Sequence, residues 1–302
     1  MLTLVPEWTE YELVDSGSGK KLERFGEFTL VRPEPQAQWP PRLPPERWRA
    51  ADGEFSQSNG SRRAWQFRER VPERWIVHRR NLAFLVEPAP SGHVGIFPDQ
   101  ACHWDTIAEL IKRAARPAKL LCLFGHTGLA TLSAAAAGAE VTHVDASRKA
   151  IRLARQNQAL SALSDCPIRW IVEDALTFVG REVRRGNRYD ALLLDPPRFG
   201  RGPHGQIWKL DDSLSELLGE CRRLLSASPL FVLLNMYATT LTRGHTEREA
   251  EGLRVSLEKM LTNLRAAIVA GELAIEDPTR RRISRAVFAR AGFTPRSEGV
   301  PR

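Results

Sequence analysis

Short apolar runs alternate with stretches of helical spacing from about residue 105 to residue 268. The runs are too short for helices, and apolar residues on both faces are typical of strands buried in a parallel sheet. The predicted strands cover residues 120–124, 141–144, 168–172, 191–194 and 230–234. The predicted helices cover residues 106–115, 130–137, 149–159, 213–225 and 247–268. This alternation predicts an α/β fold with a doubly wound, mostly parallel sheet.

The two ends of the chain follow other patterns. Before about residue 90, β-like runs at 28–32 and 75–78 are separated by turn-forming residues such as those at 58–61, and helical spacing is absent. Near the other end, candidate strands at 272–275 and 283–288 flank a basic turn and predict a hairpin at the edge of the sheet. We therefore expect a β-rich N-terminal region (1–90), for substrate recognition or as a cap, and a Rossmann-like domain with seven strands (91–302).

The strand at 191–194 ends in an acid and two prolines, within the segment YDALLLDPPRFGRG. Open α/β folds place their ligands at the carboxyl ends of parallel strands, so Asp195 is expected to border a site. Pro196 and Pro197 cannot donate ladder hydrogen bonds, and they disfavour helical geometry in the preceding residue. This turn is therefore expected to form a stiff rim that is rich in hydrogen-bond acceptors.

A second candidate segment is LLCLFGHTG, residues 120–128, where a buried strand turns into an Ala-rich helix. Gly125 and Gly128 let the backbone approach a ligand closely, and the helix that follows offers unpaired N–H groups. A tight strand-to-helix connection would use the same glycines without any ligand. The glycines alone therefore do not predict a cofactor loop. They do so only together with the acidic residues at the ends of the following strands.

Two further acids follow strands in the same way. Asp145 could accept hydrogen bonds from ribose hydroxyls, or it could cap the next helix, a task that Ser147 could also perform. Asp174 could accept from an adenine amine, or cap a helix containing Leu176 and Phe178. Three polar strand ends in succession favour one shared ligand.

Composition narrows the class of that ligand and of the partner. The chain has 302 residues, a formal charge of +8 and 42% hydrophobic residues, which allow a sizeable core and favour an anionic partner such as nucleic acid. The sequence contains no phosphate-binding P-loop motif. Asp145, together with the DPP turn, favours a nucleoside cofactor that has no pyrophosphate, and S-adenosylmethionine is such a cofactor. The sequence shows no secretory signal and no apolar run that could span a bilayer. Its four cysteines are scattered without zinc spacing, which predicts reduced thiols, a cytoplasmic location and no metal site.

Four segments together resemble the class I S-adenosylmethionine-dependent methyltransferases. They are LFGHTGLATLSAAAAGAEVTHVDAS, WIVEDALTFV, YDALLLDPPRFGRGPHGQIWKL and PLFVLLNMY. The similarity is greatest to the branch of large-subunit ribosomal RNA methyltransferases and their shorter bacterial relatives, and it covers about residues 75–276.

The resemblance implies roles for the matching residues. Phe124, Gly125, Thr127 and Gly128 would hold the methionine part of the cofactor, and Asp145 with Ala146 would bind its ribose. Asp174 and Ala175 would contact adenine, and Asp195, Pro196, Pro197 and Phe199 would border the methyl group and orient the acceptor. The segment HVGIFPDQ resembles one that folds over the pocket, with Gly95, Phe97 and Gln100 as contacts, although an interdomain turn would look the same.

Some positions depart from the family pattern and bear on the chemistry. Cys122 stands where relatives often have an acid or amide, and His126 where they often have tyrosine, so the ends of the methionine moiety could be held differently. Leu129 occupies a position that is often small. Relatives that methylate cytosine C5 place a cysteine after the strand that here ends in LLNMY. Its absence predicts methylation of a nitrogen.

Basic residues near the DPP turn suggest contacts to RNA, and the resemblance implies that this RNA is ribosomal. Arg198 and Arg201 would bind phosphate or base, and Trp208 would stack on an extruded base or anchor the core. The arginines at 181–188 fit a solvated surface better. We predict a methyltransferase acting on RNA. A non-catalytic RNA-binding relative and a methyltransferase for a small molecule or protein are the alternatives.

Overall fold

The computed structural model describes residues 1–57, 63–114, 116–237 and 243–293. Its largest element is an eight-stranded sheet with the order β1-β16-β17-β15-β12-β9-β10-β11. The strands are β1 (Leu2–Leu4), β9 (Lys119–Leu123), β10 (Glu140–Asp145), β11 (Ile168–Val172), β12 (Ala191–Leu194), β15 (Phe231–Tyr237), β16 (Ala266–Glu276) and β17 (Arg282–Phe293). The predicted Rossmann-like sheet is confirmed, and its seven strands are joined by β1 as an eighth.

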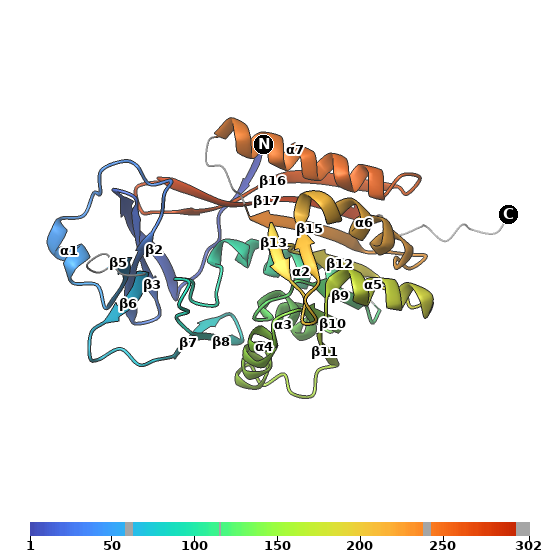
Figure 1. The fold of residues 1–302 in the computed structure, drawn as a ribbon, viewed down its shortest axis with the longest axis horizontal. Coiled ribbons are helices and arrows are strands. Elements are labelled where there is room, and N and C mark those ends of the chain that lie inside the picture. The colour runs from blue at the N-terminus through green and yellow to red at the C-terminus, as the bar shows by residue number, and fades with distance from the viewer. Residues whose placement is uncertain (58–62, 115, 238–242, 294–302) are drawn as a thin grey trace.

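Helices cover both faces of this sheet (Figure 1). On one face lie α2 (Ala101–Arg113), α3 (Leu129–Ala136) and α4 (Arg148–Leu160). On the other lie α5 (Ala175–Arg184), α6 (Leu210–Arg223) and α7 (Arg243–Met260). The central strand β12 is fully buried, since helices pack on both of its sides. This explains why its sequence is a continuous apolar run.

The end of the chain differs in two ways from the prediction. The helix predicted to reach residue 268 ends at Met260, because Asn263 adopts a left-handed conformation with φ 69° and the chain turns there. The residues that follow alternate in exposure, which is the period of a strand, and form the long β16. The hairpin is confirmed, but it is not a free edge, since β17 pairs with β15 and β1 covers β16.

The N-terminal region contains a five-stranded sheet and a separate hairpin. The sheet has the order β2-β3-β4-β5-β6, and the hairpin is β7-β8. These strands are β2 (Tyr11–Gly17), β3 (Lys20–Phe25), β4 (Phe28–Pro33), β5 (Gly53–Gln57), β6 (Arg63–Phe67), β7 (Trp75–Arg79) and β8 (Leu82–Val86), with the short helix α1 (Pro45–Arg49) before β5. The predicted runs at 28–32 and 75–78 lie in β4 and β7. The predicted turn at 58–61 lies outside the described residues.

The tryptophans of this region serve as internal anchors. Trp39 donates its indole N–H to the carbonyl of Ser16 (3.0 Å), Trp65 donates to Ala89 (2.8 Å), and Trp75 donates to Phe25 (2.9 Å). An indole that is satisfied inside the protein has no N–H left for a ligand. These contacts favour a structural role for the three side chains.

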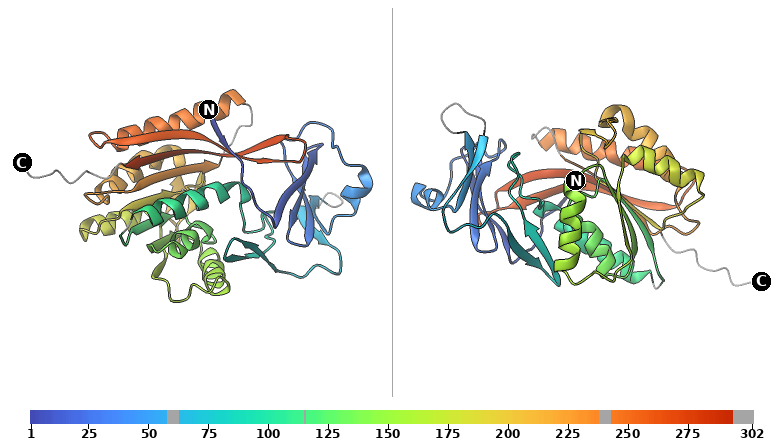
Figure 2. Two further views of the ribbon diagram at one scale, coloured as in Figure 1. Left: turned by 180° about the vertical axis from the view of Figure 1, so that it is seen from behind. Right: turned by 60° about the horizontal axis from the view of Figure 1, so that its bottom comes forward.

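The tip of the β16-β17 hairpin reaches the N-terminal sheet, as both views in Figure 2 show. Arg281 forms ion pairs with Asp15 and with Asp277 (2.7 Å). Arg285 likewise pairs with Glu34 at 2.5 Å. All three carboxylates are almost completely buried. The contact is therefore a desolvated charge network between segments about 250 residues apart in the sequence.

One apolar cluster crosses the predicted boundary near residue 90. Phe25, Val77 and Phe84 share it with Trp104 of α2 and Ile275 of β16. The division into residues 1–90 and 91–302 stays a prediction. None of the helices within the described residues combines the length and the apolar character that crossing a membrane requires.

Candidate functional site

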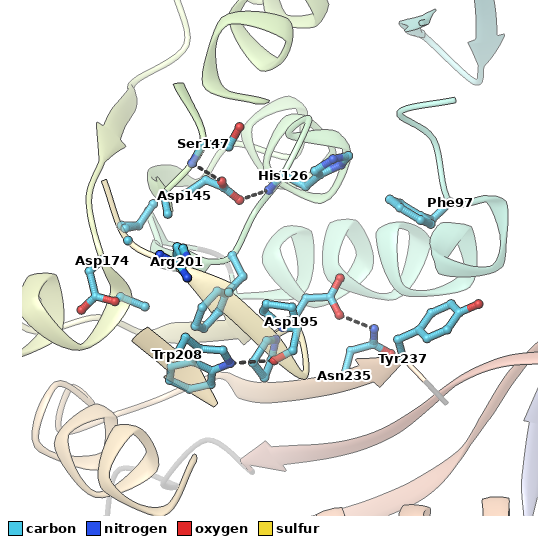
Figure 3. Close-up of a pocket in the computed structure, with 18 of the residues that line it drawn as sticks. Phe97, His126, Asp145, Ser147, Asp174, Asp195, Arg201, Trp208, Asn235 and Tyr237 are labelled. Carbon is cyan, nitrogen blue, oxygen red and sulfur yellow. Dashed lines mark hydrogen bonds between the residues drawn. The ribbon is translucent and has the colours of Figure 1, made fainter. Parts of the chain in front are cut away.

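A cavity of about 450 Å³ opens at the carboxyl ends of the central strands. Residues that follow β9, β10, β11 and β12 contribute to its walls, together with the last residues of β15 (Figure 3). Parallel strands bring these segments together although they are far apart in the sequence, and the open end of such a sheet is the usual ligand site of doubly wound folds.

The loop between β9 and α3 is shaped by close packing. A Cβ on Gly125 would lie 2.3 Å from Cε1 of His143, and a Cβ on Gly128 would lie 2.9 Å from the Cβ of Ala154. Gly128 also has a φ of 84°, in the left-handed region. Both glycines are thus required by the packing of the loop, and Gly128 points toward α4 and does not line the cavity.

Asp145 closes this loop from the neighbouring strand. Its carboxylate accepts a hydrogen bond from the backbone N–H of His126 (2.9 Å) and another from that of Ser147 (2.8 Å). Ser147 itself caps α4 through the N–H of Ala150. The capping alternative for Asp145 is therefore wrong, and its carboxylate, whose pKa is raised by burial against these two hydrogen bonds, lines the cavity.

Asp174 caps α5 by accepting a hydrogen bond from the N–H of Thr177 (2.9 Å). Asp174 and Ala175 also line the cavity, so the helix cap and a ligand contact are compatible at this position. Glu173 stands beside them and pairs with Arg181 at 2.9 Å.

Asp195 is held by an amide from the next strand. Asn235 donates its Nδ2 hydrogen to Oδ1 of Asp195 over 2.6 Å (Figure 3). Burial raises the pKa of Asp195 to about 6 despite this hydrogen bond, and the nearby Asp99 and Asp145 act in the same direction. The carboxylate is thus a stronger proton acceptor than an exposed aspartate.

The segment before α2 folds over the site. The carbonyl of Gly95, a residue with φ 79°, accepts a hydrogen bond from the Thr127 hydroxyl at 2.6 Å. The rings of Phe97 and His126 meet with centroids 5.4 Å apart. These contacts tie the segment directly to the glycine loop, which a simple interdomain turn would not require.

The DPP turn continues into a short hairpin, β13 (Phe199–Arg201) and β14 (Ile207–Lys209). Trp208 is only 3% exposed, and it donates its indole N–H to the Pro197 carbonyl (2.6 Å) beneath the ring of Phe124. A buried side chain is not free to stack on an extruded base, so this expected role is corrected to that of an anchor for the turn. Arg201 lines the cavity.

The structure brings together most of the predicted site residues. Those lining the main cavity are Phe97, Gln100, Phe124, Asp145, Ala146, Asp174, Ala175, Asp195, Pro196, Pro197, Arg201 and Trp208. Those lining only a smaller adjoining cavity are Gly95, Gly125 and Thr127. Three others line neither: Gly128, Arg198, which pairs with Glu249 at 3.0 Å, and Phe199, which is 73% exposed on the hairpin.

Several polar residues that line the main cavity were not among the predicted site residues. They include Asp99, Ser147, Glu173, Asn235 and Tyr237. The last two end the apolar run of β15, which is the signal that identified Asp195 at the end of β12. The same rule applied to every strand would have found them.

Comparisons with known proteins identify the family. No family model matches the chain. A crystal structure of the SAM-dependent methyltransferase from Agrobacterium tumefaciens is 39% identical and superposes with a TM-score of 0.91, covering 97% of this chain and 94% of that one. The chain therefore belongs to the S-adenosylmethionine-dependent methyltransferases, as the motifs predicted.

Two more distant relatives add context. A putative methyltransferase from Streptococcus mutans, with 16% identity and a TM-score of 0.69 over 95% of this chain and 76% of its own, shares the fold. The ribosomal RNA large subunit methyltransferase I of Aeromonas salmonicida is 26% identical over 148 residues, 49% of this chain. The match spans only 34% of that curated relative.

Proposed function

We propose that this protein binds S-adenosylmethionine in the main cavity and transfers its methyl group to a base nitrogen of RNA, with ribosomal RNA as the substrate. The observation that carries the proposal is the convergence of Asp145, Asp174 and Asp195 from three strand ends onto one cavity. The family supports the cofactor, and the names of the curated relatives support the ribosomal substrate.

The residues present fit the cofactor. Asp145 would offer carboxylate lone pairs to ribose hydroxyls, and Asp174 and Ala175, which line the same cavity, would contact the adenine ring. Phe124 and Phe97 provide apolar walls. When bound, the cofactor supplies a methyl group on a positively charged sulfur, which a nucleophile attacks from the side opposite the sulfur.

Nitrogen fits the acceptor better than carbon. Attack through cytosine C5 requires a cysteine thiolate. None of the four cysteines, all of them in the described part of the chain, lines the main cavity. Burial raises the pKa of Cys122, in the adjoining cavity, to about 12, so it is a protonated thiol at neutral pH.

Asp195 can orient a nitrogen acceptor and take its proton. The carboxylate oxygen that Asn235 does not occupy can accept an N–H of the base, which turns the nitrogen lone pair toward the methyl group. The new C–N bond forms as the C–S bond breaks, the sulfur keeps that electron pair, and the N–H proton passes to Asp195. A pKa of about 6 suits a group that holds this proton briefly and returns it to solvent.

Tyr237 is the best candidate for stacking on the base, in place of Trp208. It lines the cavity, is 49% exposed, and has the Arg285 guanidinium 5.1 Å from its ring centroid. Nearby, Phe199 and Ile207 expose apolar side chains on the β13-β14 hairpin, as a surface for unstacked bases would.

The test is transfer of labelled methyl from S-adenosylmethionine to deproteinised large-subunit ribosomal RNA, followed by digestion and mass spectrometry of the nucleosides. We expect an N-methylated nucleoside, and no label with Asp145→Ala, which should also lose cofactor binding in calorimetry. Label in 5-methylcytidine would refute the nitrogen acceptor. Label only in protein or small amines would refute RNA.

The same assay tests Tyr237. Tyr237→Ala should lower RNA methylation by about 5- to 150-fold, because base–aromatic stacking contributes about 1–3 kcal/mol. Cofactor affinity should not change, and Tyr237→Phe should retain activity. A Tyr237→Ala variant with full activity would exclude the stacking role.

A further inference from the structure

A smaller cavity of about 60 Å³ adjoins the main one beneath the glycine loop. It lies between α2 and the ends of β12 and β15, and shares Phe97, Phe124 and Asp195 with the main cavity. A water molecule occupies about 10–15 Å³ of such space, so the cavity admits about four to six non-hydrogen atoms. An α-amino acid group, with one nitrogen, two carbons and two oxygens, is of this size.

Buried polar atoms without partners are concentrated around this cavity. Within the described residues they include both ring nitrogens of His103, Nδ1 of His126 and Oδ1 of Asn235, and all three residues line the cavity. Buried polar groups in folded proteins almost always have hydrogen-bond partners. Such a cluster indicates a polar ligand at this place.

His103 is the least expected member of the cluster. It lies on α2, is 1% exposed, and meets Phe288 edge to face with ring centroids 4.8 Å apart. Burial lowers the pKa of its imidazole to about 3, so the ring is neutral at physiological pH. A neutral imidazole carries one N–H donor and one lone pair.

Asn235 has a fixed orientation. Its Nδ2 donates to the Asp195 carboxylate at 2.6 Å, and the reversed amide would place oxygen against oxygen. Its Oδ1 is therefore left as a hydrogen-bond acceptor inside the protein. Asp195 adds a negative charge on the same side of the cavity.

We propose that His103 and Asn235 bind the amino-acid end of S-adenosylmethionine. The His103 N–H donates to the carboxylate, and Oδ1 of Asn235 accepts from the ammonium group. In the described part of the chain no lysine or arginine lines this cavity, so a neutral donor must take the place of a cation at the carboxylate. Cys122, which lines the same cavity as a protonated thiol, does not supply a charge for the ammonium group.

This inference rests on the proposed function. Two ligands distinguish binding of the cofactor as such from binding of its amino-acid end by His103 and Asn235. S-adenosylhomocysteine carries the amino-acid end, whereas 5′-methylthioadenosine keeps the adenosine and sulfur but lacks it. Calorimetry with His103→Phe, which preserves the ring contact to Phe288, should show at least about a 10-fold loss of affinity for S-adenosylhomocysteine, as expected for a lost hydrogen bond to a charged group. The affinity for 5′-methylthioadenosine should not change.

Two further variants control the experiment. His103→Gln retains a donor and an acceptor, and should recover much of the affinity. His204→Phe, at an exposed position on the turn of the β13-β14 hairpin, should change neither affinity.

The possible outcomes are distinct. Unchanged affinity of His103→Phe for S-adenosylhomocysteine, or an equal loss for both ligands, would overturn the assignment to the amino-acid end. Equal affinity of the unmodified protein for the two ligands would overturn this inference alone. If the unmodified protein bound neither ligand, the proposed function itself would fail.

Discussion

At the scale of single residues, Asp195 and Asp190 lie at opposite ends of the same strand and have opposite titration behaviour. Burial raises the pKa of Asp195 to about 6. For Asp190, burial acts in the same direction, but hydrogen bonds from Arg116, Lys119 and Ser226 outweigh it and lower the pKa below its ordinary value. The ionised form of Asp190 therefore stabilises the folded protein. The ionised form of Asp195 destabilises it, and this makes the Asp195 carboxylate a better proton acceptor.

The raised pKa of Asp195 predicts how stability depends on pH. Between the ordinary aspartate value near 4 and about 6 the folded state binds the proton that the unfolded state has lost, so this stabilisation is present at low pH and disappears as the pH rises through about 6. Asp195→Asn should therefore increase the free energy of unfolding at pH 8 by about 1–2 kcal/mol, and hardly at pH 4. Denaturant titrations at the two values measure this.

Asp190→Asn is the matched control for that experiment. Its lowered pKa means that the carboxylate stabilises the protein above the ordinary value near 4, and that this contribution is lost as the pH falls through the folded-state pKa. The variant should be less stable than the unmodified protein at pH 8 and approach it at low pH. A stability loss at pH 8 for both variants would contradict the contrast between the two acids.

Gly125 provides a test of the glycine loop. Its added Cβ would meet the ring of His143 at 2.3 Å and the Cys122 sulfur at 2.9 Å, and both side chains are buried. Gly125→Ala should therefore cost about 1–3 kcal/mol of stability and displace the loop. Thermal unfolding measures the first effect and calorimetry with S-adenosylhomocysteine the second. Gly138→Ala, with no atom within 4 Å of its added Cβ but a φ of 98°, would show the cost of backbone strain alone.

At the scale of elements, the β16-β17 hairpin connects the large sheet to the N-terminal sheet. Its tip carries Arg281, which neutralises Asp15 and Asp277, two carboxylates that are nearly inaccessible to water. The same guanidinium lies 5.9 Å from the ring centroid of Trp39. One side chain therefore joins the hairpin to two segments of the N-terminal region.

Arg281→Ala should destabilise the protein by about 3–5 kcal/mol, because it leaves two buried carboxylates without their cation. Arg282→Ala is the matched control. Its side chain is 55% exposed and pairs with Glu276, so its loss should cost less than about 1 kcal/mol. Equal losses of unfolding free energy for the two variants in urea titrations would show that the buried ion pairs stabilise the protein no more than the exposed one.

At the scale of the whole molecule, the N-terminal region and the rest of the chain each contribute residues to the other's sheet or core. The first strand of the chain, β1, pairs in parallel with β16 of the large sheet. In return, Trp104 and Ile275 complete an apolar cluster with Phe25 and Phe84. The predicted division at residue 90 therefore passes through a continuous core.

A fragment of residues 91–302 tests that division. We expect it to lack cooperative unfolding, because removal of the N-terminal region exposes Trp104 and Ile275 and removes β1, one of the two strands that pair with β16. Near-ultraviolet circular dichroism and limited proteolysis, with the full chain as the reference, would measure this. A fragment that unfolds cooperatively would support two independently folding domains.

The sequence by itself determined the features that depend on neighbouring residues. Apolar runs such as the one at 191–194 predicted the strands, and residues at the strand ends, Asp145 and Asp195, predicted the cavity, because each signal lies within a few positions. The predicted end of the last helix, at residue 268, was wrong. The apolar residues at 266–270 fit a helix as well as a strand until their neighbours in the sheet are known.

Only the tertiary structure decided which of the candidate side chains face a ligand. Trp208 and Tyr237 are both aromatic residues near a predicted turn or strand end, and both line the main cavity. Trp208, however, is buried and donates its N–H to Pro197, whereas the Tyr237 side chain is half exposed. His103 gave no signal at all, because its neighbours in the cavity come from loops and strands far away along the chain. Burial and the pairing of polar atoms depend on contacts between distant segments, and no local pattern records them.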